Sequence, residues 1–217
     1  MKRRVFTLSA TAAMAAGTLS WTHAAHAQAA KPEAGSDYLV LDKRVAVEAP
    51  AGKIEVVEFF WYSCPHCNAF EPTLEPWTKK LPKDVQFRRV PVAFRDDFVP
   101  QQRLFYALEA MDLVDKLHGK VFAAIHGEKL PLNRPELIVE WVAKQGVDKA
   151  KFTEQYNSFA VANKATRAKQ LQDSYRVEGV PALGVAGRFY TDGSLAKNMA
   201  RALQVVEHLV GEVRAGR

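Results

Sequence analysis

The feature that most restricts the fold of this chain is its cysteine content, two residues that stand three positions apart in Cys64-Pro65-His66-Cys67. The run directly before them, Ile54 to Tyr62, is rich in β-branched and aromatic residues and predicts a buried strand. Pro65 suits the first turn of a helix. The sequence therefore predicts that both thiols lie where a strand passes into a helix.

Two other uses of the cysteines have less support. A bridge across so few residues restrains the unfolded chain weakly, by on the order of 2 kcal/mol of loop entropy. Zinc sites with the Cys-x-x-Cys spacing need further ligands, and the sequence has no second cysteine pair and no His-x3-5-His pattern. It also has no glycine motif for a flavin, a nicotinamide or a phosphate group. We therefore expect no cofactor and no metal.

The predicted helix start gives Cys64 a chemical role. Free backbone N–H groups at a helix N-terminus point at the sulfur and lower the pKa of the thiol. Because the thiolate is the nucleophile in disulfide exchange, we expect Cys64 to be the reactive thiol and Cys67 its buried partner with the higher pKa. His66 adds positive charge beside the thiolate if it is protonated, and its alternative is an ordinary exposed histidine.

Three residues near the motif each have two interpretations. Glu58 stands in the apolar strand, where a carboxylate without a partner is costly to bury. It either lies beneath the cysteines and exchanges protons with Cys67, or faces solvent at a strand edge. Glu71 is either a modulator of the local field or an ordinary exposed acid. Trp61 or Tyr62 is predicted to lie at the rim and to provide an apolar surface for unfolded chains, unless the whole aromatic run belongs to the core.

Residues 1–27 are predicted to be a cleaved signal peptide, because Lys2-Arg3-Arg4 precedes an apolar, alanine-rich stretch that ends near Ala25-His26-Ala27. The alternative is a membrane anchor, but about 17 mildly apolar residues are too few to span a bilayer securely. We therefore expect the remaining chain outside the cytoplasm, in a bacterial periplasm. Removing residues 1–27 lowers the formal net charge from +6 to +3, which is too small to favour nucleic acid as a partner.

The strand, the Cys-Pro-His-Cys motif, the helix after it and the much later Val180-Pro181 resemble the thioredoxin superfamily, and specifically the DsbA family of periplasmic dithiol oxidases. The tetrapeptide is that family's hallmark, and the resemblance extends from about Tyr38 to the C-terminal helix. It implies an α/β chain with a thioredoxin fold and an inserted helical domain. It also implies that Val180-Pro181 forms a cis-proline loop that faces the cysteines and binds a substrate strand, instead of an ordinary strand start. Glu58 and Glu71 match acidic positions that the family keeps near its active site.

The resemblance also implies an activity and its partners. An enzyme of this kind donates the Cys64–Cys67 disulfide to newly exported, folding proteins with free cysteines, and a quinone-linked membrane oxidase of the DsbB kind restores it. A reductase or isomerase on the same fold is the first alternative, and a noncatalytic peptide-binding module is the second. The Pro65-His66 dipeptide is what favours oxidation. Isomerases of this superfamily add an N-terminal dimerisation domain, for which residues 28–54 are too few, so we expect a monomer.

The expected domain order follows this fold. After the signal peptide we expect a mobile tail over residues 28–37, a thioredoxin-like part over 38–99, a helical insertion over 100–176 and a second thioredoxin-like part over 177–217. The predicted elements outside the insertion are strands at Val40 to Val47, Ile54 to Phe60 and Val85 to Phe94, a helix from Pro65 to about Leu81 that Pro72 and Pro76 should kink, a hairpin around Gly187, and a closing helix from Lys197 to Arg214. Apolar stripes in the insertion are expected to form core, and Asp148 is expected to cap one of its helices.

Overall fold

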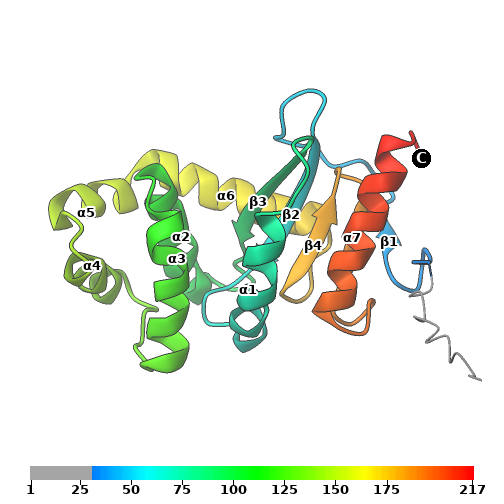
Figure 1. The fold of residues 1–217 in the computed structure, drawn as a ribbon. Helices are drawn as coiled ribbons and strands as arrows, with labels where there is room; N and C mark the ends of the chain where they lie inside the picture. The colour runs from blue at the N-terminus through cyan, green and yellow to red at the C-terminus, as the bar shows by residue number, and fades with distance from the viewer. Residues whose placement is uncertain (1–30) are drawn as a thin grey trace, which may run out of the picture. The chain divides into compact units, whose positions relative to one another are not determined.

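The strand that leads to the cysteine motif, β2 (Ile54–Phe60), lies inside a five-stranded mixed sheet of order β1-β5-β4-β2-β3 (Figure 1). The computed structural model describes residues 31–217, so the predicted signal peptide and the start of the predicted tail lie outside the described residues. The other strands are β1 (Leu39–Val40), β3 (Val85–Pro91), β4 (Ala182–Val185) and β5 (Phe189–Asp192). β2 pairs in parallel with β3 and antiparallel with β4, and all its residues are buried.

Helices cover both faces of the sheet. One face packs against α1 (Pro65–Thr78) and α7 (Met199–Arg214). The other face packs against helices from the long segment between β3 and β4, and Figure 1 shows α6 passing behind the sheet. The helices of that segment are α2 (Val99–Ala110), α3 (Val114–Phe122), α4 (Pro135–Lys144), α5 (Lys149–Asn157) and α6 (Phe159–Ser174), with short turns at Asp96–Phe98 and Ala123–Gly127. This is the segment for which a helical insertion is predicted.

The side chains of β2 point alternately to the two faces of the sheet, and this determines which of them lies under the cysteine motif. Val56 belongs to the hydrophobic cluster formed with α1 and α7, whereas Val57 and Phe59 belong to the cluster formed with α2 to α6. Because successive residues of a strand point to opposite faces, Glu58 points to the same face as Val56. The carboxyl group is thereby directed beneath α1, the helix that begins at the motif.

The predicted strand over Val40 to Val47 is wrong beyond Val40. The chain continues without a strand ladder, and the N–H groups of Leu41 and Val45 donate to the carbonyl groups of Arg188 and Gly187 over 2.8 Å each. Two such bonds hold the segment against the β4–β5 turn. Gly187 has φ +65°, and a Cβ at this position would lie 2.1 Å from the Val45 carbonyl oxygen, so this close approach requires glycine.

The predicted ends of two other elements differ from the observed ones. β3 ends at Pro91 and not at Phe94, because Pro91 lies opposite Phe60, where the partner strand β2 ends. α1 ends at Thr78 and not at Leu81, although it contains Pro72 and Pro76 within one helix.

Two other details concern the ends of elements. The side chain of Asp148 accepts the Lys151 N–H over 3.0 Å, so its predicted role as a helix cap is confirmed. Asp37, the last residue of the predicted tail, accepts a hydrogen bond from the Thr191 hydroxyl over 2.7 Å and pairs with Arg201 at 3.4 Å. Within residues 31–217, no helix is long and apolar enough to cross a membrane.

We predict that Gly184→Ala destabilises the fold by about 1–3 kcal/mol, the usual cost of overpacking a core. A Cβ on Gly184 in β4 would lie 2.4 Å from the ring of the buried Tyr175, which also accepts the Gly187 N–H through its hydroxyl over 3.1 Å. The control is Gly211→Ala on α7, where a Cβ meets no atom within 4 Å. There the better helix propensity of alanine should raise stability by about 0.5–1 kcal/mol. Urea unfolding measures both, and equal midpoints for the two variants would contradict the prediction.

Candidate active site

Cys64 lies at the junction of β2 and α1. It is the N-cap of α1, with extended backbone angles of φ −78° and ψ 118°, and Pro65 is the first helical residue. Its sulfur accepts the Cys67 N–H over 3.4 Å, in the manner of an ordinary capping side chain. Cys64 is 7% exposed and Cys67 is 0% exposed. An approaching thiolate therefore reaches the sulfur of Cys64 and not that of Cys67.

The two thiols have opposite acidities. The pKa of Cys64 is lowered to about 6, first by a hydrogen bond from the Cys67 thiol and then, against the effect of burial, by the backbone N–H groups of Cys67 and His66 and the charge of His66. Burial raises the pKa of the Cys67 thiol far above its ordinary value. At neutral pH Cys64 is therefore largely a thiolate, while Cys67 keeps its proton. The side chain of His66 is exposed, and its charge nevertheless acts on Cys64.

The loop before β4 faces the cysteines. The Val180–Pro181 peptide bond is cis, as predicted. Cys64 Sγ lies 3.3 Å from the Val180 carbonyl oxygen, to which it donates a hydrogen bond only in its thiol form, and this contact joins residues that are 116 positions apart. Pro181 is buried, whereas Val180 is half-buried at the surface. The backbone of Val180 thus lies within reach of any group that binds at the Cys64 sulfur.

Glu58 is buried beneath the motif, so the solvent-facing alternative is wrong. It is 0% exposed, and Arg89, its register partner on β3, places Nε 3.1 Å from its carboxylate. This pair is not aligned for a hydrogen bond, and neither carboxylate oxygen of Glu58 has a hydrogen-bond partner within residues 31–217. Burial, which outweighs the attraction of Arg89, raises the pKa of Glu58 to about 8, and the charge of Glu71 adds to this. The carboxyl group is therefore mostly protonated at pH 7.

Glu71 is not an ordinary exposed acid, because its side chain is 14% exposed and accepts hydrogen bonds from two others. Arg89 Nη2 lies 3.1 Å from one of its carboxylate oxygens, and His118 Nε2 lies 3.3 Å from the other. Burial alone would raise the pKa of Glu71, but the hydrogen bond to His118 and the charge of Arg89 hold it below its ordinary value. Glu58 and Glu71 therefore differ in protonation although they share one arginine.

Sequence reasoning missed three groups of this network: Arg89, His118 and the hydroxyl of Tyr62. His118 on α3 is buried, and its Nδ1 lies 2.9 Å from the Tyr62 hydroxyl. Burial lowers the pKa of His118, so the ring is neutral, with Nε2 donating to Glu71 and Nδ1 accepting from Tyr62. The arginine pair in β3 was a usable signal because it interrupts an apolar strand. His118 gave no such signal in the sequence, since it stands 56 positions from Tyr62 among the apolar residues of a helix.

Trp61 is half-buried, and its ring stacks on Phe98 with centroids 3.8 Å apart and planes at 7°. Tyr62 is buried, so of the two predicted rim residues Trp61 is the one with exposed area. The turn that follows is held by α2: Gln101 donates to the Ser63 hydroxyl over 2.7 Å and accepts the Ser63 N–H over 3.2 Å. The helical segment therefore fixes the backbone that presents Cys64.

Known proteins are similar to this chain in sequence and in fold. A family model described as DSBA-like thioredoxin domain matches residues 97–204. The thiol:disulfide interchange protein DsbA of Burkholderia cepacia is 42% identical over 214 residues, which cover 99% of this chain and 98% of that one. This chain belongs to the DsbA family. The crystal structure of Pseudomonas aeruginosa DsbA superposes with a TM-score of 0.81 at 43% identity, covering 85% of this chain and 96% of that one.

Membership in the DsbA family confirms the predicted thioredoxin-like α/β fold and makes this chain a thiol–disulfide oxidoreductase. A DsbA from Xylella fastidiosa, 31% identical, superposes with a TM-score of 0.80 and covers 86% of this chain and 100% of that one. Within residues 31–217, no group of three or more His, Cys, Asp or Glu side chains is placed to hold a metal ion.

We predict that iodoacetamide alkylates Cys64 of the reduced protein with a half-maximal rate near pH 6, the pKa of its thiol, and leaves Cys67 unmodified. Peptide mapping by mass spectrometry at each pH measures this. In urea, where the fold is lost, both cysteines should instead react with a midpoint of about pH 8.5. Faster labelling of Cys67 in the folded protein, or a Cys64 midpoint near that of the unfolded chain, would contradict the assignment.

Proposed function

We propose that this chain is a dithiol oxidase that donates its Cys64–Cys67 disulfide to newly exported, folding proteins. The observation that carries the proposal is the asymmetry between the two sulfurs, one stabilised as a thiolate at the start of α1 and the other buried as a thiol. A disulfide that breaks into a stabilised thiolate is a strong oxidant, because the reduced state is favoured. The same asymmetry directs attack to the more accessible Cys64.

The reaction has two exchange steps. A substrate thiolate attacks Cys64 Sγ, the Cys64–Cys67 bond breaks, and the Cys67 sulfur takes the electron pair and a proton. The second substrate thiolate then attacks the substrate sulfur of this mixed disulfide, and Cys64 leaves as a thiolate. The substrate gains one disulfide and loses two electrons, which the enzyme holds as its dithiol. The low pKa of Cys64 makes it a good leaving group in the second step.

Glu58 supplies the proton for Cys67 in this mechanism. The departing Cys67 sulfur is strongly basic in its buried position, and the charge of Glu58 adds to the rise in its pKa, which indicates that the two groups interact. Glu58 has a pKa of about 8, so at pH 7 it carries the proton that the thiolate needs. When the disulfide is restored, the carboxylate takes the proton back. Glu71, held ionised by His118 and Arg89, modulates this exchange.

The substrate binds as an extended strand along Val180-Pro181, beside the apolar rim. The Val180 carbonyl oxygen lies 3.3 Å from Cys64 Sγ, and the Val180 N–H makes no hydrogen bond within residues 31–217. Both backbone groups can therefore pair with a substrate chain, as in strand addition. Pro181 has no N–H to compete, and Trp61 offers apolar area for an unfolded segment. His66 tunes the Cys64 thiolate from its exposed position.

The cellular setting follows from family membership and from the N-terminal sequence. The protein acts in the periplasm after removal of a signal peptide, as a monomer. A quinone-linked membrane oxidase of the DsbB kind accepts the two electrons and restores the disulfide. A reductase or isomerase on the same fold is the alternative.

We predict that Glu58→Gln slows oxidation of a dithiol test peptide and removes the change in rate near pH 8, because glutamine cannot donate a proton to Cys67. The matched control is Glu55→Gln, a second buried acid of β2 that pairs with Arg88 at 3.0 Å. Loss of that pair should lower stability but leave the pH profile unchanged. Stopped-flow kinetics between pH 6 and 9 distinguishes the two. An unchanged profile in Glu58→Gln would remove Glu58 from the mechanism.

We predict that the reduced protein is more stable than the oxidised protein at pH 7, and that this advantage depends on pH. The pKa of Cys64 is lowered in the folded state, so the advantage is complete above the unfolded value of about 8.5 and is lost as pH falls through about 6. Between these limits the ratio of the two unfolding constants should change by up to about tenfold per pH unit. Urea unfolding of both forms at pH 5.5, 7 and 8 measures it. An oxidised form that is the more stable one at pH 7 would favour the reductase.

A further inference from the structure

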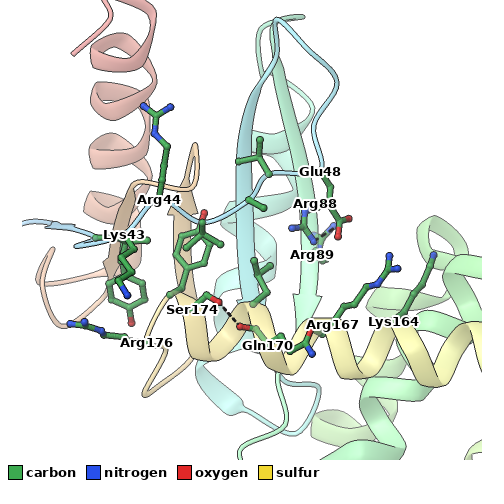
Figure 2. A pocket seen from close by; sticks show the side chains of 18 of the residues that line it. Lys43, Arg44, Glu48, Arg88, Arg89, Lys164, Arg167, Gln170, Ser174 and Arg176 are labelled. Carbon is green, nitrogen blue, oxygen red and sulfur yellow. Dashed lines mark hydrogen bonds and ion pairs between the residues drawn. The ribbon is translucent and has the colours of Figure 1, made fainter.

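A groove of about 900 Å³ lies away from the cysteines, between the segment 39–48 and helix α6 (Figure 2). Tyr106, Leu171 and Tyr175 line it between these two walls. The residues that line it include neither the Cys-Pro-His-Cys motif nor Val180-Pro181. The groove therefore lies away from the sulfurs at which disulfides are exchanged, and Arg89 is the residue that it shares with the network beneath them.

Positive charge lies on both walls of this groove. Figure 2 shows Lys43 and Arg44 on the segment 39–48, and Lys164 and Arg167 on the facing side of α6. The acids that line the groove are each engaged by one of its cations: Asp42 with Arg176 at 2.6 Å, Glu109 with Lys164 at 2.6 Å, and Glu48 with Arg88 at 3.6 Å.

Three exposed groove cations remain after these pairs are formed, since Arg89, the other cation of the lining, pairs with Glu58 and Glu71. Lys43, Arg44 and Arg167 are exposed, and none of them has an ion pair within residues 31–217. Because the neighbouring acids are already neutralised, these three charges set the local potential. A ligand that complements them carries negative charges that reach both walls.

We propose that this groove binds an extended, acidic segment of another polypeptide. The rim carries apolar side chains that are unusually exposed, Leu39 at 42%, Val40 at 53% and Val47 at 44%, and apolar residues between the acids of a peptide would cover them. The N–H groups of residues 42–44 donate no hydrogen bond within the described chain, so the wall also offers backbone donors to an extended partner. Charge, apolar area and free backbone thus occur together.

A polypeptide fits this groove better than a lipid surface does. A bilayer is flat, and the cations on the α6 wall lie inside a hollow, where a flat surface cannot reach them together with those of the other wall. A single phosphate would fill a small part of about 900 Å³ and contact one wall. The proposal does not depend on thiol chemistry, because the three cations that it uses, Lys43, Arg44 and Arg167, take no part in the proposed exchange.

The test measures binding of a fluorescent, cysteine-free peptide with glutamate at alternate positions and leucine or serine between them, and of the same peptide with glutamine. The triple variant Lys43→Gln, Arg44→Gln, Arg167→Gln removes the unpaired groove cations. The matched control changes three exposed lysines outside the groove, Lys53→Gln, Lys83→Gln and Lys144→Gln, and lowers the net charge equally. Fluorescence anisotropy at low ionic strength gives the dissociation constants, and neither triple variant alters the proposed thiol site.

We expect the groove variant to bind the acidic peptide about eightfold more weakly, because each of three exposed charge contacts contributes a factor of about two. The control should change binding less than twofold, and the glutamine peptide should bind weakly to all proteins. Binding should persist in Cys67→Ser protein whose Cys64 holds an uncharged cysteine peptide as a mixed disulfide. Equal losses in both triple variants, loss of binding in the blocked protein, or binding to phosphatidylglycerol vesicles without binding to the acidic peptide would each overturn the proposal.

Discussion

The rest of the candidate site depends on the buried guanidinium of Arg89, which holds two acids beneath the cysteine motif. Its Nε lies 3.1 Å from Glu58 and its Nη2 lies 3.1 Å from Glu71. Removing one partner of such a buried pair usually costs about 3–5 kcal/mol, because the remaining charge is left without compensation. One cation cannot fully neutralise two acids, so one of them takes up a proton. Burial and hydrogen bonding decide that this is Glu58, since Glu71 has His118 as a second partner.

This unequal division of protons extends to the sulfurs above. Cys67 is fully buried on the side of Glu58, where ionisation of either group opposes ionisation of the other. Cys64 lies three residues earlier, at the helix start, where N–H groups and the Cys67 thiol stabilise a negative charge. The difference in acidity between the two cysteines of the motif therefore arises from the burial of Cys67, to which the charge of Glu58 adds, and from the position of Cys64 at a helix N-terminus.

The sequence was informative where the chemistry is local. The order of β2, Cys64 and α1 follows from β-branched residues and a proline, and Ile54 to Phe60 was predicted with both ends correct. The sequence was uninformative where the fold brings together side chains that are far apart in the chain. His118 reaches Tyr62 and Glu71 from α3, and its spacing resembles that of any core residue. The predicted strand after Val40 was wrong for another reason: apolar residues at both ends of the segment 40–47 are as compatible with a chain held against a turn by two hydrogen bonds as they are with a strand.

The helices between β3 and β4 do more than cover the sheet. Gln101 from α2 binds Ser63 through both the oxygen and the nitrogen of its side-chain amide. Nε2 of His126, from the turn after α3, lies 2.8 Å from the Tyr62 carbonyl oxygen. His118 holds the Tyr62 side chain from the same region. These contacts fix the two residues immediately before Cys64, and so determine where its sulfur stands relative to the first turn of α1. A change in the packing of this helical segment should therefore alter the acidity of Cys64, because the N–H groups stabilise the thiolate only within hydrogen-bonding distance.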